Sequence, residues 1–276
     1  MERYERSEPE ALGVREVPRP TLEDACFRAL GLIERNCEYL EQHIQAIKAD
    51  DATQQAVKDI VAATARLERA LNENFTLMEF LQEPDCSKRT VVDLCILLRQ
   101  VAAQADMIRE QLGVELVLED GGLEGCLVQA DHYEVEVLCL HLLSNALRAS
   151  KPSGIVQMTL HRDEDCCRLI IADEGCGLPK TEDVLLENRR AFLGGAKAGL
   201  LICREICRRM GWTLELCQRP ECGTQAVVTI PQKDVLTGSA ELHMPDGTKA
   251  IQRQYRLRAM LVKELRTMPE QKLSVE

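Results

Sequence analysis

A repeat of apolar residues near the N-terminus constrains the fold more than any other feature of this chain. Over residues 26–47 and again over 57–81, side chains of the repeat recur at alternating steps of three and four. This heptad pattern predicts two amphipathic helices. The polar segment 48–53 separates them, and Thr53 is the expected N-cap of the second helix. The repeat consists of Cys26, Leu30, Ile33, Cys37, Leu40, Ile44 and Ile47, then Val57, Ile60, Thr64, Leu67, Leu71, Asn74, Met78 and Leu81.

Two such helices joined by a short turn predict an antiparallel helical hairpin over residues 21–84, which Pro84 ends. One hairpin alone exposes its apolar stripe, so we expect a homodimer in which two hairpins form a four-helix bundle. The alternative, which the sequence leaves open, is that the stripe packs on the chain's own second domain. Residues 1–20 carry three prolines and many charges and predict a flexible arm.

The segment 88–231 has a different pattern, in which short apolar strands alternate with helices. Helices beside a mostly antiparallel sheet predict an α/β sandwich. The fold class is therefore α+β, a helical hairpin followed by an α/β-sandwich domain. Asp131 is the expected N-cap of the second of three helices. We expect helices over residues 91–111, 131–149 and 198–210, and strands over 114–118, 127–130, 155–162, 168–172, 213–218 and 225–230.

Residues 232–276 have no clear place in that sandwich and form a C-terminal extension. Within it, residues 248–266 predict a basic helix, which is either a solvated helix or a docking surface for an acidic partner.

Composition excludes several classes of protein. The net charge of −11 opposes a general affinity for nucleic acid. The chain has no signal-peptide pattern and no apolar run long enough to span a bilayer, so we expect a cytoplasmic protein without a membrane partner. The thirteen cysteines include no paired C-x-x-C motif for zinc, and we expect reduced thiols.

Four short segments of the second domain carry side chains suited to binding a ligand. In chain order they read HLLSNALRAS over 141–150, DEGCGLP over 173–179, GGAKAGLLI over 194–202 and GTQAVVTIP over 223–231. Asp173 follows an apolar strand, and its carboxylate can accept a hydrogen bond from an amine. Glycines before a helix leave backbone amides free to bind phosphate. Together the four segments predict a nucleotide site.

The order of these segments resembles the ATP-binding domain shared by sensor histidine kinases, DNA gyrase, Hsp90 and MutL. The preceding hairpin is similar to that of the sensor histidine kinases, so the resemblance covers roughly residues 25–231. It implies that the chain binds ATP and Mg²⁺, with Asn145 as a Mg²⁺ ligand and Asp173 as the residue that recognises adenine. The other nucleotide contacts that it implies are Arg148, Gly175, Gly177, Gly194, Gly195, Lys197, Gly199, Leu200 and Thr224.

The chain departs from the family's pattern within these segments. His141 stands where relatives usually carry another Asn, which leaves it a doubtful Mg²⁺ ligand that could still approach a phosphate. Ala149 stands where relatives often carry a larger residue that helps to cover the nucleotide. Lys197 replaces a glycine of the loop that acts as a lid over the nucleotide in relatives, and residues 191–193 are a remnant of the family's aromatic box. From the residues alone, the alternatives are that Asn145 is a helix-surface amide and that the segment after the strand is an ordinary turn.

A second departure concerns the residue that would accept the phosphoryl group. Relatives carry His followed by an acidic residue midway along the first helix. Here the best alignment places Glu38 at that position, and an alignment anchored on the second helix places Asn36 there. His43 is the only histidine of the hairpin and lies beside the apolar stripe, so it is the candidate phosphoacceptor; the alternative is a surface histidine.

The resemblance implies a histidine-kinase-like signalling protein that transfers the γ-phosphoryl group of Mg-ATP to a histidine, with a response-regulator receiver domain as the partner. Two alternatives remain open at this stage. The chain is a pseudokinase or adaptor that binds ATP or a receiver domain without phosphorylating itself, or it is a serine kinase that acts on a partner protein.

Overall fold

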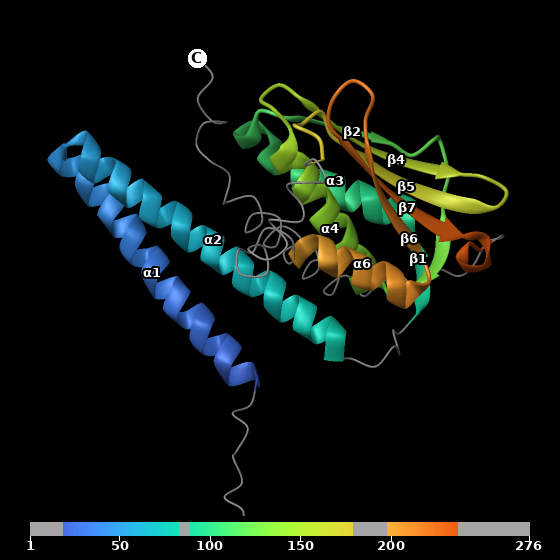
Figure 1. Cartoon of the computed structure of the whole chain (residues 1–276), viewed down its shortest axis with the longest axis horizontal. Coiled ribbons are helices and arrows are strands. Elements are labelled where there is room, and N and C mark those ends of the chain that lie inside the picture. Colours follow the sequence, from blue (N-terminus) through green and yellow to red (C-terminus); the bar gives the residue numbers. More distant parts are fainter. Residues whose placement is uncertain (1–18, 83–88, 179–197, 237–276) are drawn as a thin grey trace, which may run out of the picture.

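The computed structural model describes residues 19–82, 89–178 and 198–236 (Figure 1). A long helical hairpin, made of α1 (Arg19–Ile47) and α2 (Asp51–Gln82), precedes a domain of helices and strands. The hairpin tip points away from that domain, and the lower half of α2 lies beside α6 (Ala198–Met210). Pro84 and nearly all of the expected arm lie outside the described residues, but α1 begins inside the arm's expected range. Pro20 is tolerated there because the first turn of a helix has no partner for its missing N–H.

The N-cap of α2 is Asp50, and the expectation that Thr53 caps this helix is wrong. The backbone amide of Thr53 donates to Oδ1 of Asp50 (2.8 Å), and the Thr53 hydroxyl donates to Oδ2 (3.0 Å). These bonds lower the pKa of the Asp50 carboxyl below its usual value. Both residues are good N-caps, but the left-handed backbone of Lys48 (φ 50°) ends α1 early enough for a new helix to begin at Asp51.

The heptad stripe of the hairpin divides into an inner and an outer half. Leu30, Cys37 and Ile44 of α1 are buried against α2. Val57 and Thr64 of α2 are buried against α1. The outer half is exposed in the single chain, with exposed fractions of 41–63% for Ile33, Leu40, Ile47, Ile60, Leu67 and Leu81. Exposed residues therefore recur at seven-residue intervals along both helices, and all of them are apolar except Asn74 on α2.

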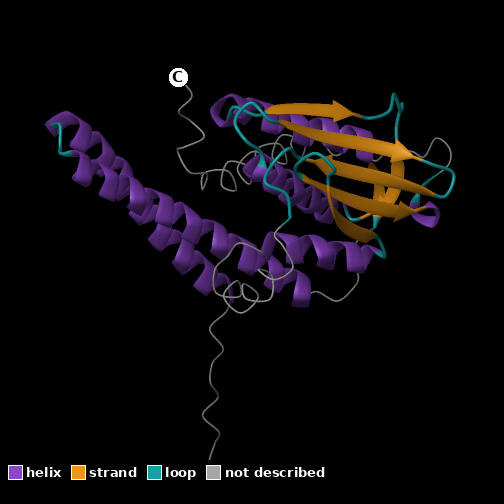
Figure 2. Ribbon diagram, turned by 45° about the horizontal axis from the view of Figure 1, so that its top comes forward, coloured by secondary structure: helices purple, strands orange, loops and turns teal. Residues whose placement is uncertain are grey.

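The second domain is a layer of helices on one face of a sheet (Figure 2). The five-stranded sheet has the order β2-β4-β5-β7-β6, in which only the β2–β4 pair is parallel. A smaller antiparallel pair joins β1 (Thr90–Asp93) to β3 (Leu127–Ala130). The α/β sandwich expected from the sequence is confirmed. The remaining elements are β2 (Glu115–Glu119), β4 (Ile155–Arg162), β5 (Cys166–Ala172), β6 (Thr213–Gln218), β7 (Thr224–Pro231), α3 (Leu94–Leu112), α4 (His132–Ala149) and the short 3₁₀ helix η1 (Gln232–Asp234).

Helix α3 and the C-terminal extension differ from the sequence-based prediction. Helix α3 begins at Leu94 rather than at residue 91, because Val91 and Val92 pair with β3 and Asp93 caps the helix through its Oδ1 (2.9 Å from the Cys95 amide). The C-terminal extension is also partly integrated. The amide of Leu236 donates to the Leu127 carbonyl (2.8 Å), so the first residues after β7 pack beside β3.

Helix α4 lies at the centre of the domain and is buried along most of its length. Asp131 caps it as expected, accepting from the backbone amides of Tyr133 and Glu134. All twelve cysteines among the described residues are free thiols. Burial raises the pKa of both Cys139 and Cys207 to about 12, so these thiols stay protonated and serve as core side chains.

One buried arginine fixes the lower end of α2 to the second domain. Arg209, near the end of α6, donates from Nη1 to the backbone carbonyl of Phe80 (2.9 Å). Its Nη2 forms an ion pair with Oε1 of Glu134 (2.9 Å), and its guanidinium lies 5.6 Å from the centre of the Phe80 ring. Phe80 also stacks on Tyr133. The hairpin thus contacts its own second domain through Phe80, while the outer apolar stripe stays exposed.

Candidate nucleotide site

Asp173 directly follows β5; the residue is 4% exposed, and backbone amides hold its carboxylate. Oδ1 accepts from the amide of Gly175 (2.8 Å) and from the amide of Thr224 (3.2 Å). The Asp173 amide in turn donates to the Thr224 carbonyl (2.9 Å). Among the described residues, no donor is assigned to Oδ2. The strand end therefore presents a fixed carboxylate with one oxygen available as an acceptor.

The glycines around Asp173 are required by close packing. An added Cβ on Gly223 would lie 1.9 Å from the Asp173 carbonyl oxygen, and one on Gly175 would lie 2.2 Å from the carbonyl oxygen of Ala149. Gly177 has a φ of +78°, which disfavours any other residue. The absence of side chains thus lets the turn after β5 approach both the end of α4 and the start of β7.

Helix α4 carries the next three candidate residues. His141 is buried (4% exposed), whereas Asn145 and Arg148 are half-buried. His141 and Asn145 are four residues apart and therefore share one face of the helix. Ala149, at the end of α4, adjoins Gly175. The face that carries His141 and Asn145 therefore leads toward the corner occupied by Asp173.

The start of α6 lies against the other end of this face. A Cβ on Gly199, the second residue of α6, would lie 3.1 Å from Nδ1 of His141. His141 and Ala149 are eight residues apart, which corresponds to roughly 12 Å along the helix. One face of α4 therefore connects the strand end at Asp173 with the start of α6, where Leu200 lies in the first turn. Gly194, Gly195, Lys197 and the aromatic remnant at 191–193 lie outside the described residues.

Two residues that sequence reasoning missed complete the corner at Asp173. Arg219 donates from Nη1 to the Asp173 carbonyl (3.0 Å). Gln218 accepts from the Leu178 amide (2.8 Å) and donates to the Gly223 carbonyl (3.0 Å). No sequence motif marked them, because they reach the corner only when the β6–β7 hairpin folds back beside β5.

His43 lies far from this site within one chain. Its exposed ring stacks on Tyr39, with ring centroids 6.0 Å apart. The start of α6 meets α2 at Glu73, close to Phe75, whose ring contacts Phe27 across the hairpin. Sixteen residues separate Phe27 from His43, which places His43 roughly 24 Å further along α1. The structure does not bring this candidate phosphoacceptor to the nucleotide site.

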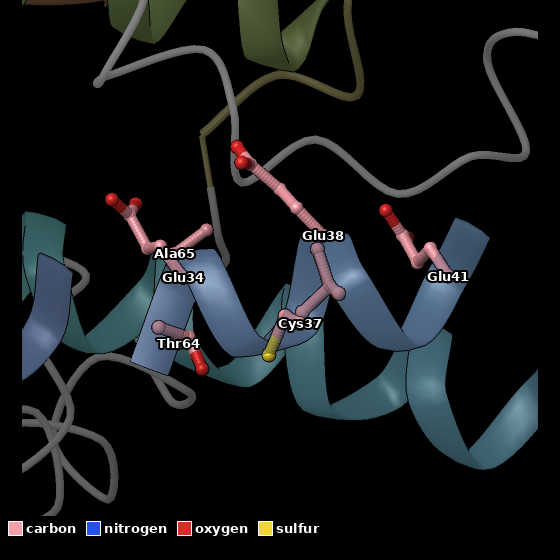
Figure 3. Close-up of a pocket in the computed structure, with 7 residues that line it drawn as sticks. Glu34, Cys37, Glu38, Glu41, Thr64 and Ala65 are labelled. Carbon is pink, nitrogen blue, oxygen red and sulfur yellow. The ribbon is translucent and has the colours of Figure 1, made fainter. Parts of the chain in front are cut away.

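The two aligned alternatives to His43 have different surroundings. Glu38 lines a cavity of about 180 Å³ between α1 and α2, together with Glu34 and Glu41 (Figure 3). Asn36 is exposed, and its side-chain amide donates to a backbone carbonyl one turn earlier (2.9 Å). Neither position offers an imidazole.

Residues 130–234 match the model of the histidine kinase-, DNA gyrase B- and HSP90-like ATPases. The second domain belongs to this ATPase family. The match begins just before α4 and ends in η1, so it includes Asn145, Asp173 and Gly199.

Similar curated proteins are sensor kinases. The sensor protein EvgS of Escherichia coli (strain K12) is 26% identical over 219 residues, which cover 74% of this chain and 17% of EvgS. The adaptive-response sensory kinase SasA of Synechococcus sp. (strain CC9311) is 30% identical over 112 residues, covering 38% of this chain and 29% of SasA. This chain thus spans less than a third of the length of either relative.

Solved structures show the same fold. Full-length ShkA in complex with AMPPNP has a TM-score of 0.56 at 20% identity, covering 81% of this chain and 46% of ShkA. The histidine kinase ThkA in complex with the response regulator TrrA has a TM-score of 0.51 at 20% identity, covering 77% of this chain and 63% of the ThkA chain. The expected arrangement, a helical region followed by a histidine-kinase-type α/β domain, is confirmed.

Proposed function

We propose that this chain is a histidine-kinase-like signalling protein that binds Mg-ATP and pairs with a second copy through its hairpin. The observation that carries the proposal is the hydrogen bonding of the Asp173 carboxylate. Backbone amides hold one carboxylate oxygen, and the other is available to accept from the exocyclic amine of adenine. A buried carboxylate kept in this way selects a ligand that brings its own donor.

The residues along the site suit the rest of the nucleotide. Asn145 lies between the Asp173 corner and the start of α6, where its side-chain oxygen can ligate Mg²⁺, a cation that prefers oxygen ligands. Arg148 and the first amides of α6 can bind phosphate oxygens. When bound, Mg-ATP supplies the transferable γ-phosphoryl group, and the chain's part is to position it and neutralise its charge.

His141 fits a phosphate better than a metal in this arrangement. It is buried against the start of α6, with Nδ1 directed at Gly199. A ring nitrogen that carries a proton can donate to a phosphate oxygen, whereas Mg²⁺ is held mainly by oxygen ligands. We therefore assign the metal to Asn145 and leave His141 to the phosphates.

The dimer proposal rests on the outer half of the heptad stripe. Apolar residues at seven-residue intervals are exposed on both hairpin helices, with Leu67 51% exposed and Ile47 60% exposed. A second hairpin can bury these residues in a four-helix bundle. A response-regulator receiver domain is the proposed further partner, by analogy with ThkA, which was crystallised with the response regulator TrrA.

A second function, that of a pseudokinase or adaptor, is favoured by one specific observation. His43 lies roughly 24 Å along α1 from the level of the nucleotide site, and a glutamate stands at the best-aligned phosphoacceptor position. Transfer to His43 therefore requires the second domain to move along the hairpin or to act on the other copy. If neither occurs, the chain binds ATP without phosphorylating itself.

Incubation with γ-labelled ATP and Mg²⁺ tests both functions. The purified chain is compared with the variants His43→Ala and Asp173→Asn. Acid-labile label that both variants lose identifies a histidine kinase with His43 as the acceptor. Label that only Asp173→Asn loses places the acceptor elsewhere. ATP binding by titration with no label in any sample identifies the pseudokinase, and an absence of ATP binding refutes the proposed function.

A further inference from the structure

A carboxylate of the hairpin lies at the phosphate end of the proposed site. Glu73 of α2 has a fully buried side chain. A Cβ placed on Gly199, at the start of α6, would lie 3.5 Å from Oε1 of Glu73 and 3.1 Å from Nδ1 of His141. The three residues belong to α2, α6 and α4, so the hairpin closes this end of the site.

The position suits an anion for two physical reasons. Arg69, one turn earlier on α2, forms an ion pair with Glu73, with 2.7 Å between Nε and Oε1. The start of a helix also carries partial positive charge and free amides, which attract negative groups. A carboxylate is therefore stable beside Gly199 despite its burial.

The same two properties make this spot attractive to a nucleotide phosphate. The amides at the start of α6 can bind either the Glu73 carboxylate or a phosphate. Two anions beside the same amides would repel each other strongly in a low-dielectric site. We propose that Glu73 competes with the nucleotide phosphates, so that the docked hairpin inhibits Mg-ATP binding and bound Mg-ATP displaces α2 from the start of α6. This inference rests on the proposed function.

The geometry of the interface indicates how α2 would move. Phe80 is held at the far end of α6 by Arg209, through a hydrogen bond of 2.9 Å and the contact between its ring and the guanidinium. Glu73 lies about two helical turns away along α2. Displacement at Glu73 with retention at Phe80 would swing the second domain about this end of α2. Such a swing changes the distance between the nucleotide site and α1.

Thermodynamic linkage makes the competition measurable both as nucleotide affinity and as hairpin docking. If the docked hairpin weakens phosphate binding, bound nucleotide must weaken hairpin docking by the same factor. Adenosine occupies only the end of the site at Asp173, so it should not affect docking. The competition is therefore specific to ligands that carry phosphates.

The test measures the affinity of the full chain for Mg-ATP and for adenosine by calorimetry. We expect Glu73→Gln to bind Mg-ATP on the order of tenfold more tightly, which is the scale of an anion's interaction with a helix N-terminus in a buried geometry. Adenosine affinity should not change. Glu79→Gln removes the same charge from an exposed position on the same helix and should bind both ligands as the unaltered chain does.

A second variant covers the case in which Glu73→Gln fails to fold because Arg69 is left without its carboxylate. The double variant Arg69→Gln with Glu73→Gln removes both charges and should also bind Mg-ATP more tightly. Backbone hydrogen exchange in α2 provides an independent readout: Mg-ATP, but not adenosine, should accelerate exchange around residue 73. Unchanged Mg-ATP affinity in the folded variants, together with unchanged exchange, overturns the competition alone. An absence of nucleotide binding in every variant overturns the proposed function as well.

Discussion

The replacement Asp173→Asn tests whether one oxygen of Asp173, Oδ2, recognises adenine. In the structure, Oδ1 accepts from two backbone amides, those of Gly175 at 2.8 Å and Thr224 at 3.2 Å. An asparagine must keep its oxygen at this position, because the opposite orientation would face its NH₂ toward two N–H donors. The NH₂ group therefore takes the place of Oδ2, and a donor replaces the acceptor that adenine requires.

The size of the effect follows from this exchange. A hydrogen bond to a charged group contributes about 1.5–3 kcal/mol, so the loss of affinity for ATP should be roughly 10- to 150-fold. The free energy of unfolding should fall by only about 1 kcal/mol, since both backbone amides keep an acceptor. The variant therefore separates binding from folding.

Calorimetric titration with Mg-ATP measures the affinity, and urea unfolding measures the stability. Asp131→Asn is the matched control: it removes the same charge from the N-cap of α4, where asparagine caps equally well. An ATP analogue with a carbonyl oxygen in place of the 6-amino group should bind the unaltered chain poorly. The replacement Asp173→Asn should reduce the affinity for this analogue less than it reduces the affinity for ATP. Unchanged ATP affinity in a stably folded Asp173→Asn variant would refute the assignment of the adenine pocket.

Four further results are expected. Asn145→Ala should remove the Mg²⁺ dependence of ATP affinity, as measured by titrations with and without the metal. If the affinity still depends on Mg²⁺, another residue ligates the metal. Leu67→Glu should convert a dimer into a monomer by light scattering, because it places a charge in the exposed stripe; a dimer that persists would mean that another surface pairs the chains. Arg209→Met should lower the free energy of unfolding by about 3–5 kcal/mol, since it breaks the buried ion pair with Glu134 by removing one partner, and a loss below 1 kcal/mol in urea unfolding would contradict this. Gly223→Ala should abolish ATP binding, because its φ of +88° and the 1.9 Å approach leave no room for a Cβ; normal affinity in a titration would show that the corner can rearrange.

Local sequence patterns predicted most of the elements and several of their ends. The helix at Ala198–Met210 and the N-cap at Asp131 agree with the prediction, because a helix period and a capping side chain act within a few residues. The choice between Asp50 and Thr53 as the N-cap of α2 was not predictable in the same way. Both residues suit the position, and the end of the preceding helix decided between them.

Patterns of longer range were only partly readable. The heptad repeat predicted a hairpin but did not separate Leu30, which is buried inside it, from Ile33, which is 41% exposed. Both positions satisfy the same periodicity, so only the packing of α1 on α2 distinguishes them. Arg219 gave no signal at all, since its partner Asp173 is distant in sequence and is reached only through strand pairing.

Local sequence patterns suffice to predict the helical hairpin, the α/β domain and the order of the segments of the proposed nucleotide site, because periodicity, caps and glycine-rich turns are local properties of the chain. Only the folded protein shows which face of the hairpin is left exposed, how far His43 lies from the proposed site, and that Glu73 reaches the start of α6. A heptad pattern does not reveal which helix of another domain will cover a given side chain. The stability of a buried carboxylate depends on charges and amides supplied by distant elements, so its place beside Gly199 exists only in the folded protein.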